Sequence, residues 1–256
     1  MSFYITLPSN ASQKYYSENK IGNYITKLPY PLQLDPSEYE VAIVGITYVN
    51  SIKLLTGIDD DNMIEVQGEK FEEILEIPTI HYDNLPQLIN EVNRSFRTLS
   101  YMNALLIHMS ENNRLKLSFD HKTKVKISEK LSDIFGFDGK TFFHQEQSDR
   151  TQDVKSHFIG KFPPDMSGGR YHLFIYTDIV DQQMVGSTLV PLLRMINLSG
   201  KDGETVTHTF QTPYYMNLCR HTIESISILV CDEFGSEIPF DRGQVTVTLH
   251  FRRKKN

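Results

Sequence analysis

Cysteine is scarce in this sequence: Cys219 and Cys231 are the only two among 256 residues. Two cysteines are too few for a disulfide scaffold, and their separation matches no spacing used by paired metal ligands. We therefore expect both to be small core residues. The first residues also lack the basic start, apolar stretch and cleavage site of a secretory leader. We expect synthesis and folding in a reducing compartment, with the Asn-x-Ser triplets at Asn10, Asn93 and Asn197 unglycosylated.

Long hydrophobic runs and excess positive charge are missing too. The longest apolar stretches, such as 104–109, fall far short of the ~18 residues that a membrane-spanning helix needs, so no membrane span is expected. The 26 Lys and Arg are outnumbered by 32 Asp and Glu, which disfavours nucleic acid as the principal partner. With 39% hydrophobic and 23% charged residues, the composition is typical of a soluble globular protein with a sizeable core.

Alternating hydrophobic and polar residues predict strands along much of the chain. The clearest example is 244–251, where Val245, Val247, Leu249 and Phe251 are expected to face the core. Similar patterns, or runs rich in Ile, Val and Tyr, predict further strands at 39–48, 115–119, 122–127, 170–180, 205–212 and 223–231.

Helical spacing occurs in only two places. Asp83 or Asn84 can cap a helix whose apolar stripe runs over 85–96. A short helix is expected between Ser128 as its cap and Gly136 as its stop. Two helices among roughly ten closely spaced strands indicate an all-β sandwich with helical insertions, not alternating βαβ units.

A polar stretch over 138–157 interrupts the strand pattern. It includes Gln145, Asp149, Arg150 and Lys155 and has little periodicity. A loop of this length is usually functional or disordered. Two interpretations stay open for it, a flexible surface excursion and an arm that reaches a neighbouring subunit.

Two segments resemble ligand sites only in part. The triplet at 139–141 ends like a phosphate-binding loop, but Ile134 stands where that motif needs its first glycine. The acidic run at 59–62 resembles a calcium loop, but Ile64 and Lys70 replace the required Gly and Glu. We expect a solvated turn at 59–62 and no nucleotide or metal cofactor.

Catalytic motifs are also missing. No His-Glu-x-x-His pair places two imidazoles on one helical face, and no Gly-x-Ser-x-Gly elbow presents a nucleophile. His172 and His208 fall within expected strands and are interpreted as ordinary sheet residues. We expect no enzymatic activity and no catalytic residues, although a Ser-His-Asp arrangement could still assemble from distant segments.

Four cations follow the strand at 244–251: Arg252, Arg253, Lys254 and Lys255. They are expected to form a basic tail over 252–256 that keeps the last strand soluble. Such a cluster can also hold phosphates electrostatically without reading sequence, so these residues are the candidates for a non-specific nucleic-acid contact.

Three groups of segments together resemble a known family. They are LPSN at 7–10 with YITKLPYPLQL at 24–34 and YEVAI at 39–43, FIYTDIVDQQMVG at 174–186 with LVPLLR at 189–194, and IPFDRGQVTVTLHFR at 238–252. The chain resembles the minor capsid (penton) proteins of Polinton or Maverick elements and the related adintoviruses. The residues that carry the family motif, with structural or assembly roles, are Asp178, Asp181, Gly186, Pro191, Leu192, Arg194, Phe240 and Gly243.

This resemblance implies one single jelly-roll domain over 1–256, with the polar insertion around 138–157 and the basic tail at its end. It implies a structural protein whose five copies form a ring at the vertices of an icosahedral virion. The expected partners are the protein itself, as a homopentamer, a double jelly-roll major capsid protein that builds the facets, and non-specifically the packaged DNA. Synthesis would occur inside the host cell, without secretion. The alternative function is a jelly-roll recognition module that binds a glycan or a host protein.

Overall fold

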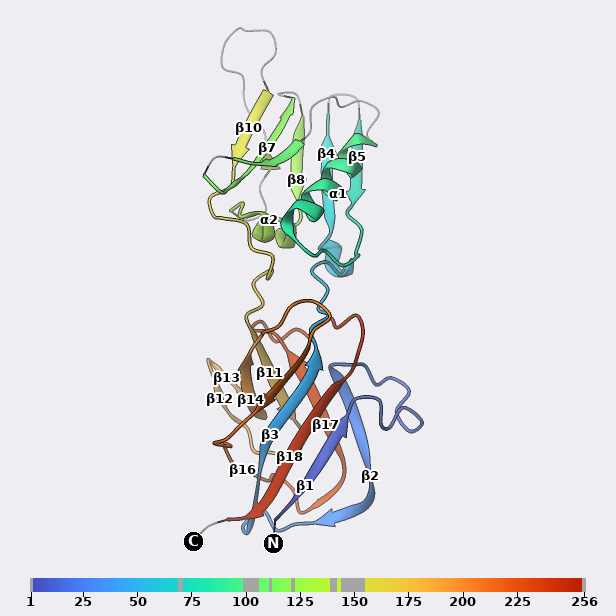
Figure 1. Ribbon diagram of the computed structural model, residues 1–256, viewed down its shortest axis with the longest axis vertical. Coiled ribbons are helices and arrows are strands. Elements are labelled where there is room, and N and C mark those ends of the chain that lie inside the picture. Colours follow the sequence, from blue (N-terminus) through green and yellow to red (C-terminus); the bar gives the residue numbers. More distant parts are fainter. Residues whose placement is uncertain are drawn as a thin grey trace. The chain divides into compact units, whose positions relative to one another are not determined.

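The chain folds as two compact units, one formed by Met1–Ile52 with Arg170–Asn256 and the other by Lys53–Gly169. This computed structural model describes residues 2–68, 71–98, 106–110, 112–120, 123–138, 142–143 and 155–254 (Figure 1). Each unit has its own hydrophobic core, and no described residue belongs to both cores. The second unit has its own sheets, helices and buried side chains.

The first unit is a sandwich of two sheets. One sheet has the strand order β1-β18-β3-β15, with the short β16 also pairing with β3, and the other has the order β14-β11-β17-β2. Its strands are β1 (Ser2–Pro8), β2 (Asn23–Gln33), β3 (Tyr39–Val49), β11 (His172–Thr177), β14 (Leu192–Asn197), β15 (Thr205–Thr209), β16 (Met216–Asn217), β17 (Thr222–Cys231) and β18 (Val245–Arg253). A separate two-stranded hairpin joins β12 (Gln183–Val185) to β13 (Thr188–Val190).

The pairing of these strands is that of a jelly roll. The first long strand of the unit pairs with the last, β1 with β18, and the second with the second-last, β2 with β17. In the same way β3 pairs with β15, and β11 with β14, always antiparallel. Rolling this long double ribbon adds the β18–β3 and β11–β17 pairings and closes two four-stranded layers. The all-β, jelly-roll fold class expected from the sequence is therefore confirmed, and the second unit is inserted between β3 and β11.

The core of the sandwich follows from the two-residue period of its strands. Val245, Val247, Leu249 and Phe251 are all fully buried, as predicted, while the residues between them are partly exposed. Phe251 also stacks on Phe3 of β1, with ring centroids 5.1 Å apart. Because the opposite sheet contributes its own buried Ile, Leu and Val side chains, the core fills the space between the two layers.

The second unit contains two further sheets, with strand orders β5-β4-β8-β9 and β10-β7-β6, and two helices (Figure 1). Its elements are β4 (Met63–Gln67), β5 (Glu72–Glu76), α1 (Leu85–Arg97), β6 (Leu106–Met109), β7 (Leu115–Asp120), β8 (Lys124–Ile127), α2 (Glu129–Phe135), β9 (Phe142–Phe143) and β10 (Lys155–Ile159), with a short 3-10 turn at Ile58–Asp60. Its core includes the fully buried rings of Phe96, Phe119 and Phe135.

Both helices begin where the sequence predicts, and α2 also ends where it predicts. Asn84 caps α1 by accepting a hydrogen bond from the Gln87 backbone at 3.0 Å, and Ser128 caps α2. Gly136 ends α2 in the left-handed conformation, with φ 74°. A Cβ at this glycine would lie 2.1 Å from the carbonyl oxygen of Phe162, so only glycine fits.

Part of the predicted polar loop at 138–157 is strand. Phe142–Phe143 forms the short β9 beside β8, and the end of the segment belongs to β10, which pairs with β7. Residues 139–141 and 144–154 lie outside the described part of the chain. In the parts that are described, no helix is long and apolar enough to cross a membrane.

Candidate functional site

Six of the eight motif residues lie on the connection between β11 and β14 or at the start of β14 itself, at one lateral edge of the jelly roll. These are Asp178, Asp181, Gly186, Pro191, Leu192 and Arg194. The connection folds into the β12–β13 hairpin, seen beside β14 in Figure 1. The other two motif residues, Phe240 and Gly243, lie on the segment that leads into β18.

Asp178 fixes the start of this connection to the neighbouring strand β17. Its carboxylate accepts a hydrogen bond from the Ser227 backbone at 2.8 Å and pairs with Arg220, with Nη2 2.5 Å from Oδ2. The thiol of Cys219 donates to the Asp178 carbonyl oxygen at 3.3 Å. Three partners on one aspartate give it a structural role, because they hold the chain at the point where it leaves the sheet.

The two cysteines differ in environment. Cys231 is buried, as expected, and burial together with the carboxylates of Asp232 and Glu237 raises the pKa of its thiol to about 11. Cys219 is exposed, so the expectation that both are core residues is wrong for it. The pattern could not reveal this, since Cys219 lies on an irregular segment that follows β16.

The β12–β13 hairpin presents an exposed apolar pair. Met184 lies opposite Leu189, and their exposed fractions are 82% and 61%. Gly186 occupies the turn with φ +61°, a conformation that two-residue hairpin turns require. The side-chain amide of Gln183 donates to the Leu192 carbonyl oxygen, which ties the hairpin to β14.

Arg194 joins the edges of the two sheets. Its guanidinium lies 4.3 Å from the ring centroid of Phe210 and 4.1 Å from that of Tyr214. Arg194 comes from β14, the last strand of one sheet, and Phe210 directly follows β15, the last strand of the other. Tyr214 and Met195 remain exposed beside it. We call Met184, Leu189, Met195 and Tyr214 the hairpin edge.

Phe240 and Gly243 serve packing at one end of the sandwich. The Phe240 ring lies 6.3 Å from that of Tyr48, and its backbone bridges to Ile52. Gly243 has φ +89°, and a Cβ there would lie 2.6 Å from Cγ2 of Val49. The motif therefore contains two kinds of residue, a set between the end of β11 and the start of β14 and a pair that positions the chain leading into β18.

We predict that Gly243→Ala destabilises the protein by about 1–3 kcal/mol more than Gly235→Ala. Both glycines have positive φ, so both substitutions incur the ~1–2 kcal/mol left-handed penalty. At Gly243 the added methyl group would also clash with Val49. At Gly235 the added methyl group would meet no atom within 4 Å. Urea unfolding of the two variants measures the difference, and equal losses would show that Val49 makes room.

The arginines at the C-terminal end do not form the expected tail. Arg252 and Arg253 belong to β18, where Arg252 Nε lies 2.7 Å from the Glu40 carboxylate and its guanidinium covers the Tyr215 ring at 3.3 Å. Arg253 pairs with Glu38 at 3.6 Å. Lys254 donates its backbone N–H to the Glu38 carbonyl oxygen, and Lys255 lies outside the described residues.

We predict that Arg252→Met lowers the stability of the protein by about 1–3 kcal/mol. The substitution keeps an apolar stem but leaves the Glu40 carboxylate, whose side chain is 16% exposed, without its ion pair. Arg253→Met is the matched control: its pair is well exposed, and such pairs contribute about 0–1 kcal/mol. Chemical unfolding at low and high salt compares the two, and equal effects would contradict this assignment.

The acidic run at 59–62 lies in a turn. The Asp61 carboxylate accepts hydrogen bonds from the backbone N–H groups of Thr56 and Gly57 and from the Thr56 hydroxyl, at 2.7 to 3.1 Å. Its oxygens are therefore used within the loop. In the described parts of the chain, no group of three or more His, Cys, Asp or Glu is placed to hold a metal ion.

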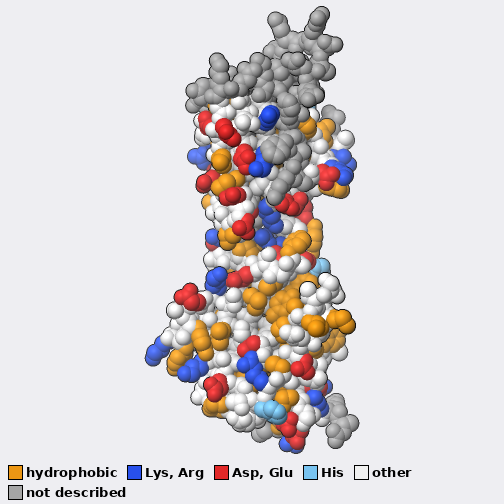
Figure 2. Space-filling view, turned by 180° about the vertical axis from the view of Figure 1, so that it is seen from behind, with side chains coloured by type: hydrophobic (Ala, Val, Ile, Leu, Met, Phe, Trp, Pro, Cys, Tyr) orange, Lys and Arg blue, Asp and Glu red, His pale blue; other side chains and the backbone are white. Residues whose placement is uncertain are grey.

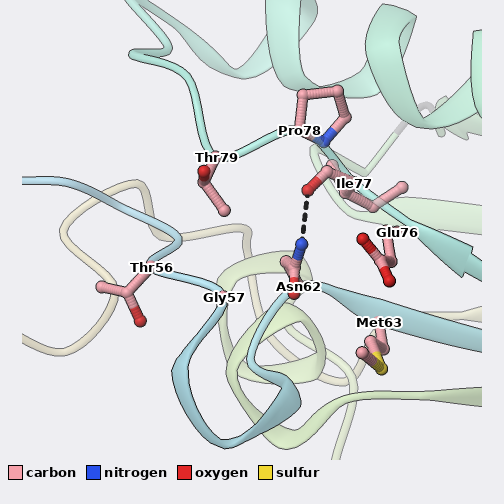
Figure 3. A pocket seen from close by; sticks show the side chains of 8 residues that line it. All are labelled: Thr56, Gly57, Asn62, Met63, Glu76, Ile77, Pro78 and Thr79. Carbon is pink, nitrogen blue, oxygen red and sulfur yellow. Dashed lines mark hydrogen bonds between the residues drawn. The ribbon is translucent and has the colours of Figure 1, made fainter.

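A cavity of about 450 Å³ adjoins this turn in the second unit (Figure 3). It is lined by Thr56, Gly57, Asn62, Met63, Glu76, Ile77, Pro78 and Thr79. The side-chain amide of Asn62 donates to the Ile77 carbonyl oxygen at 2.7 Å, a contact that holds the wall together. The lining supplies one carboxylate and neither a histidine nor a cysteine, so it lacks the paired groups of an acid–base or nucleophilic site.

The two strand histidines behave as sheet residues, as interpreted from the sequence. His172 lies in β11 with Nδ1 2.8 Å from the Glu233 carboxylate. His208 lies in β15 and stacks on Tyr48, and burial lowers the pKa of its imidazole.

No protein-family model matches the sequence, and no curated protein matches it. Among solved structures, the chain is similar to the mavirus penton protein, with a TM-score of 0.50, 9% identity, and 99% of this chain and 100% of that chain covered. It also matches a chain from the structure of the Sputnik virophage, with a TM-score of 0.46, 11% identity, and 99% and 98% covered. The likeness to the mavirus protein shows the fold of the chain.

Proposed function

We propose that this protein is a structural capsid protein that forms the vertex of an icosahedral particle, encoded by an element of the Polinton or adintovirus type. Five copies would close into a ring at each vertex. The observation that carries the proposal is the extent of the shared fold: the match to the mavirus penton protein covers essentially the whole of both chains, the jelly roll and its inserted unit together. The segments of this chain that resemble the Polinton and adintovirus minor capsid proteins support the same function.

The chemistry of the described surface agrees with an assembly role. The motif residues lie at one sheet edge and in the packing beside β18, and the structure gives them neighbours that hold backbone in place. Two Ser–His hydrogen bonds lie within the sheets and their connections, Ser118 with His157 at 2.9 Å and Ser199 with His208 at 3.4 Å. The distinctive exposed groups of the hairpin edge, by contrast, are apolar. Such a surface favours protein contacts over catalysis.

The proposal includes a contact with packaged DNA. Arg252 and Arg253 are paired with carboxylates, which leaves Lys254 and Lys255 as the residues proposed to contact phosphates. Charge reversal of the two lysines should reduce retention of DNA at low salt, and the difference should vanish as salt rises.

Electron microscopy of the protein co-assembled with its double jelly-roll facet protein tests the proposed function. Density for this chain at the fivefold vertices is the expected result. A chain that stays outside the shell, and instead binds a glycan or host protein as a monomer, would support the alternative recognition role.

A further inference from the structure

The hairpin edge has an unusual exposure of apolar atoms for an element so small. The β12–β13 hairpin has only its two strands, a size that is marginally stable by itself, yet Met184 and Leu189 point away from the core. Met195 and Tyr214 add 47% and 63% exposed side chains at the same lateral edge. Figure 2, which views the β14-β11-β17-β2 sheet from its outer side, shows hydrophobic side chains gathered on this face of the first unit.

The opposite lateral edge carries exposed aromatic rings. It is formed by β1 and β2, which end the two sheets on the side away from β15 and β14 (Figure 1). Tyr4, Tyr15 and Tyr30 are 66%, 60% and 67% exposed. We call these three residues the tyrosine edge.

The tyrosine edge is the more positive of the two edges. The connection over 177–193 carries Asp181 and also Asp178, which is paired with Arg220, and Arg194 follows it in β14. Residues 9–33 carry three exposed lysines, Lys14, Lys20 and Lys27, against one glutamate. Lys27 lies 4.5 Å from the Tyr15 ring centroid, so positive charge and aromatic surface coincide at the tyrosine edge.

At its most exposed ring, in β2, the tyrosine edge is suited to side-chain contacts and not to strand addition. Its most exposed ring, Tyr30, stands between Pro29 and Pro31 in a part of β2 where the pairing with β17 shifts register. Prolines lack the backbone N–H that an added strand would need. A partner at this part of β2 therefore binds through side-chain contacts, and the hairpin edge presents exposed apolar side chains.

We propose that the hairpin edge of one copy packs against the tyrosine edge of the next copy. The inference rests on the proposed function and names the surfaces by which its ring closes. A cyclic ring needs two different, complementary faces on each subunit, and the two edges lie on opposite sides of the sandwich. Pairing two tyrosine edges would instead bring lysines together.

Two edge variants and one control test this contact. The hairpin variant is Met184→Asp with Leu189→Asp, and the tyrosine variant is Tyr15→Asp with Tyr30→Asp. Phe234→Asp is the control, because Phe234 is 76% exposed on the turn after β17, away from both edges. All five side chains are exposed, so each variant should keep its melting transition. If the hairpin variant loses its melting transition, the single variant Met184→Ser replaces it. Tyr30→Ser replaces the tyrosine variant in the same way.

Size exclusion with light scattering, over a wide concentration range, gives the readout. The wild type and the Phe234→Asp control should form the same oligomer, and each edge variant alone should be monomeric. A mixture of the two edge variants should form one-to-one dimers and nothing larger, because each variant retains one working face. That product is specific to head-to-tail contacts.

Three results would overturn the proposed contact between the two edges. Two of them would leave the proposed function standing, and the third would remove it as well. Oligomers that survive in either edge variant, or a mixture that stays monomeric, would place the subunit contact elsewhere while leaving the ring intact as a proposal. A wild type that never self-associates, alone or with the facet protein, would remove the proposed function as well.

Discussion

A chain with Val247→Asp is expected to yield no soluble, cooperatively folded protein. Val247 is fully buried and lies between Leu7 of β1 and Ile46 of β3, so its carboxylate would have apolar neighbours on both sides. An unpaired buried charge costs several kcal/mol, against a total stability of about 5–15 kcal/mol for a typical domain. Soluble yield and circular-dichroism melting measure the effect.

Thr248→Asp is the matched control on the same strand. Thr248 is partly exposed on the outer face of the sheet, beside Thr6 and Gly45. The control should melt cooperatively, within a few degrees of the wild type. If both variants fold, or if both fail, the inward and outward assignment of β18 is wrong.

Removal of the inserted unit is expected to leave a folded jelly roll. The change replaces Lys53–Gly169 by a flexible Gly-Ser linker between Ile52 and Arg170. All buried residues of the sandwich core come from the first unit, and its sheets contain no strand of the second. The shortened chain should therefore show one cooperative melting transition, close to that of the sandwich in the full chain.

The same shortened chain with Val247→Asp provides the control, and it should not fold. An aggregated or non-cooperative shortened chain, with the full-length protein melting in a single step, would show that the sandwich depends on the inserted unit. Differential scanning calorimetry of the full chain, compared with the shortened one, distinguishes these outcomes.

The sequence predicted those elements that are determined by residues close together in the chain. The strict alternation over 244–251 predicted the buried face of β18, and Asn84, Ser128 and Gly136 predicted helix ends, because caps and alternation depend on neighbouring residues. The sequence did not reveal that 53–169 is a separate unit, since its first boundary lies in an ordinary stretch. Its second boundary had a usable signal, the two glycines just before Arg170, both with positive φ.

The sequence predicted only some features of the candidate site, because the others depend on contacts between distant segments of the chain. The motif residues of the β11–β14 connection were named from the sequence, but the exposure of Met184 and Leu189 depends on which side of the hairpin faces the sandwich. Arg252 and Arg253 were interpreted as a tail because their acidic partners, Glu40 and Glu38, lie at the other end of the sequence. Only the pairing of β18 with β3 brings them together.

Native mass spectrometry of the assembled protein tests the central claim most directly, with electron-microscopic class averages of the same sample. The account predicts a species of five subunit masses that appears as a closed ring with fivefold symmetry. A stable trimer, an open filament, or a monomer that remains absent from particle vertices when the facet protein assembles would contradict it.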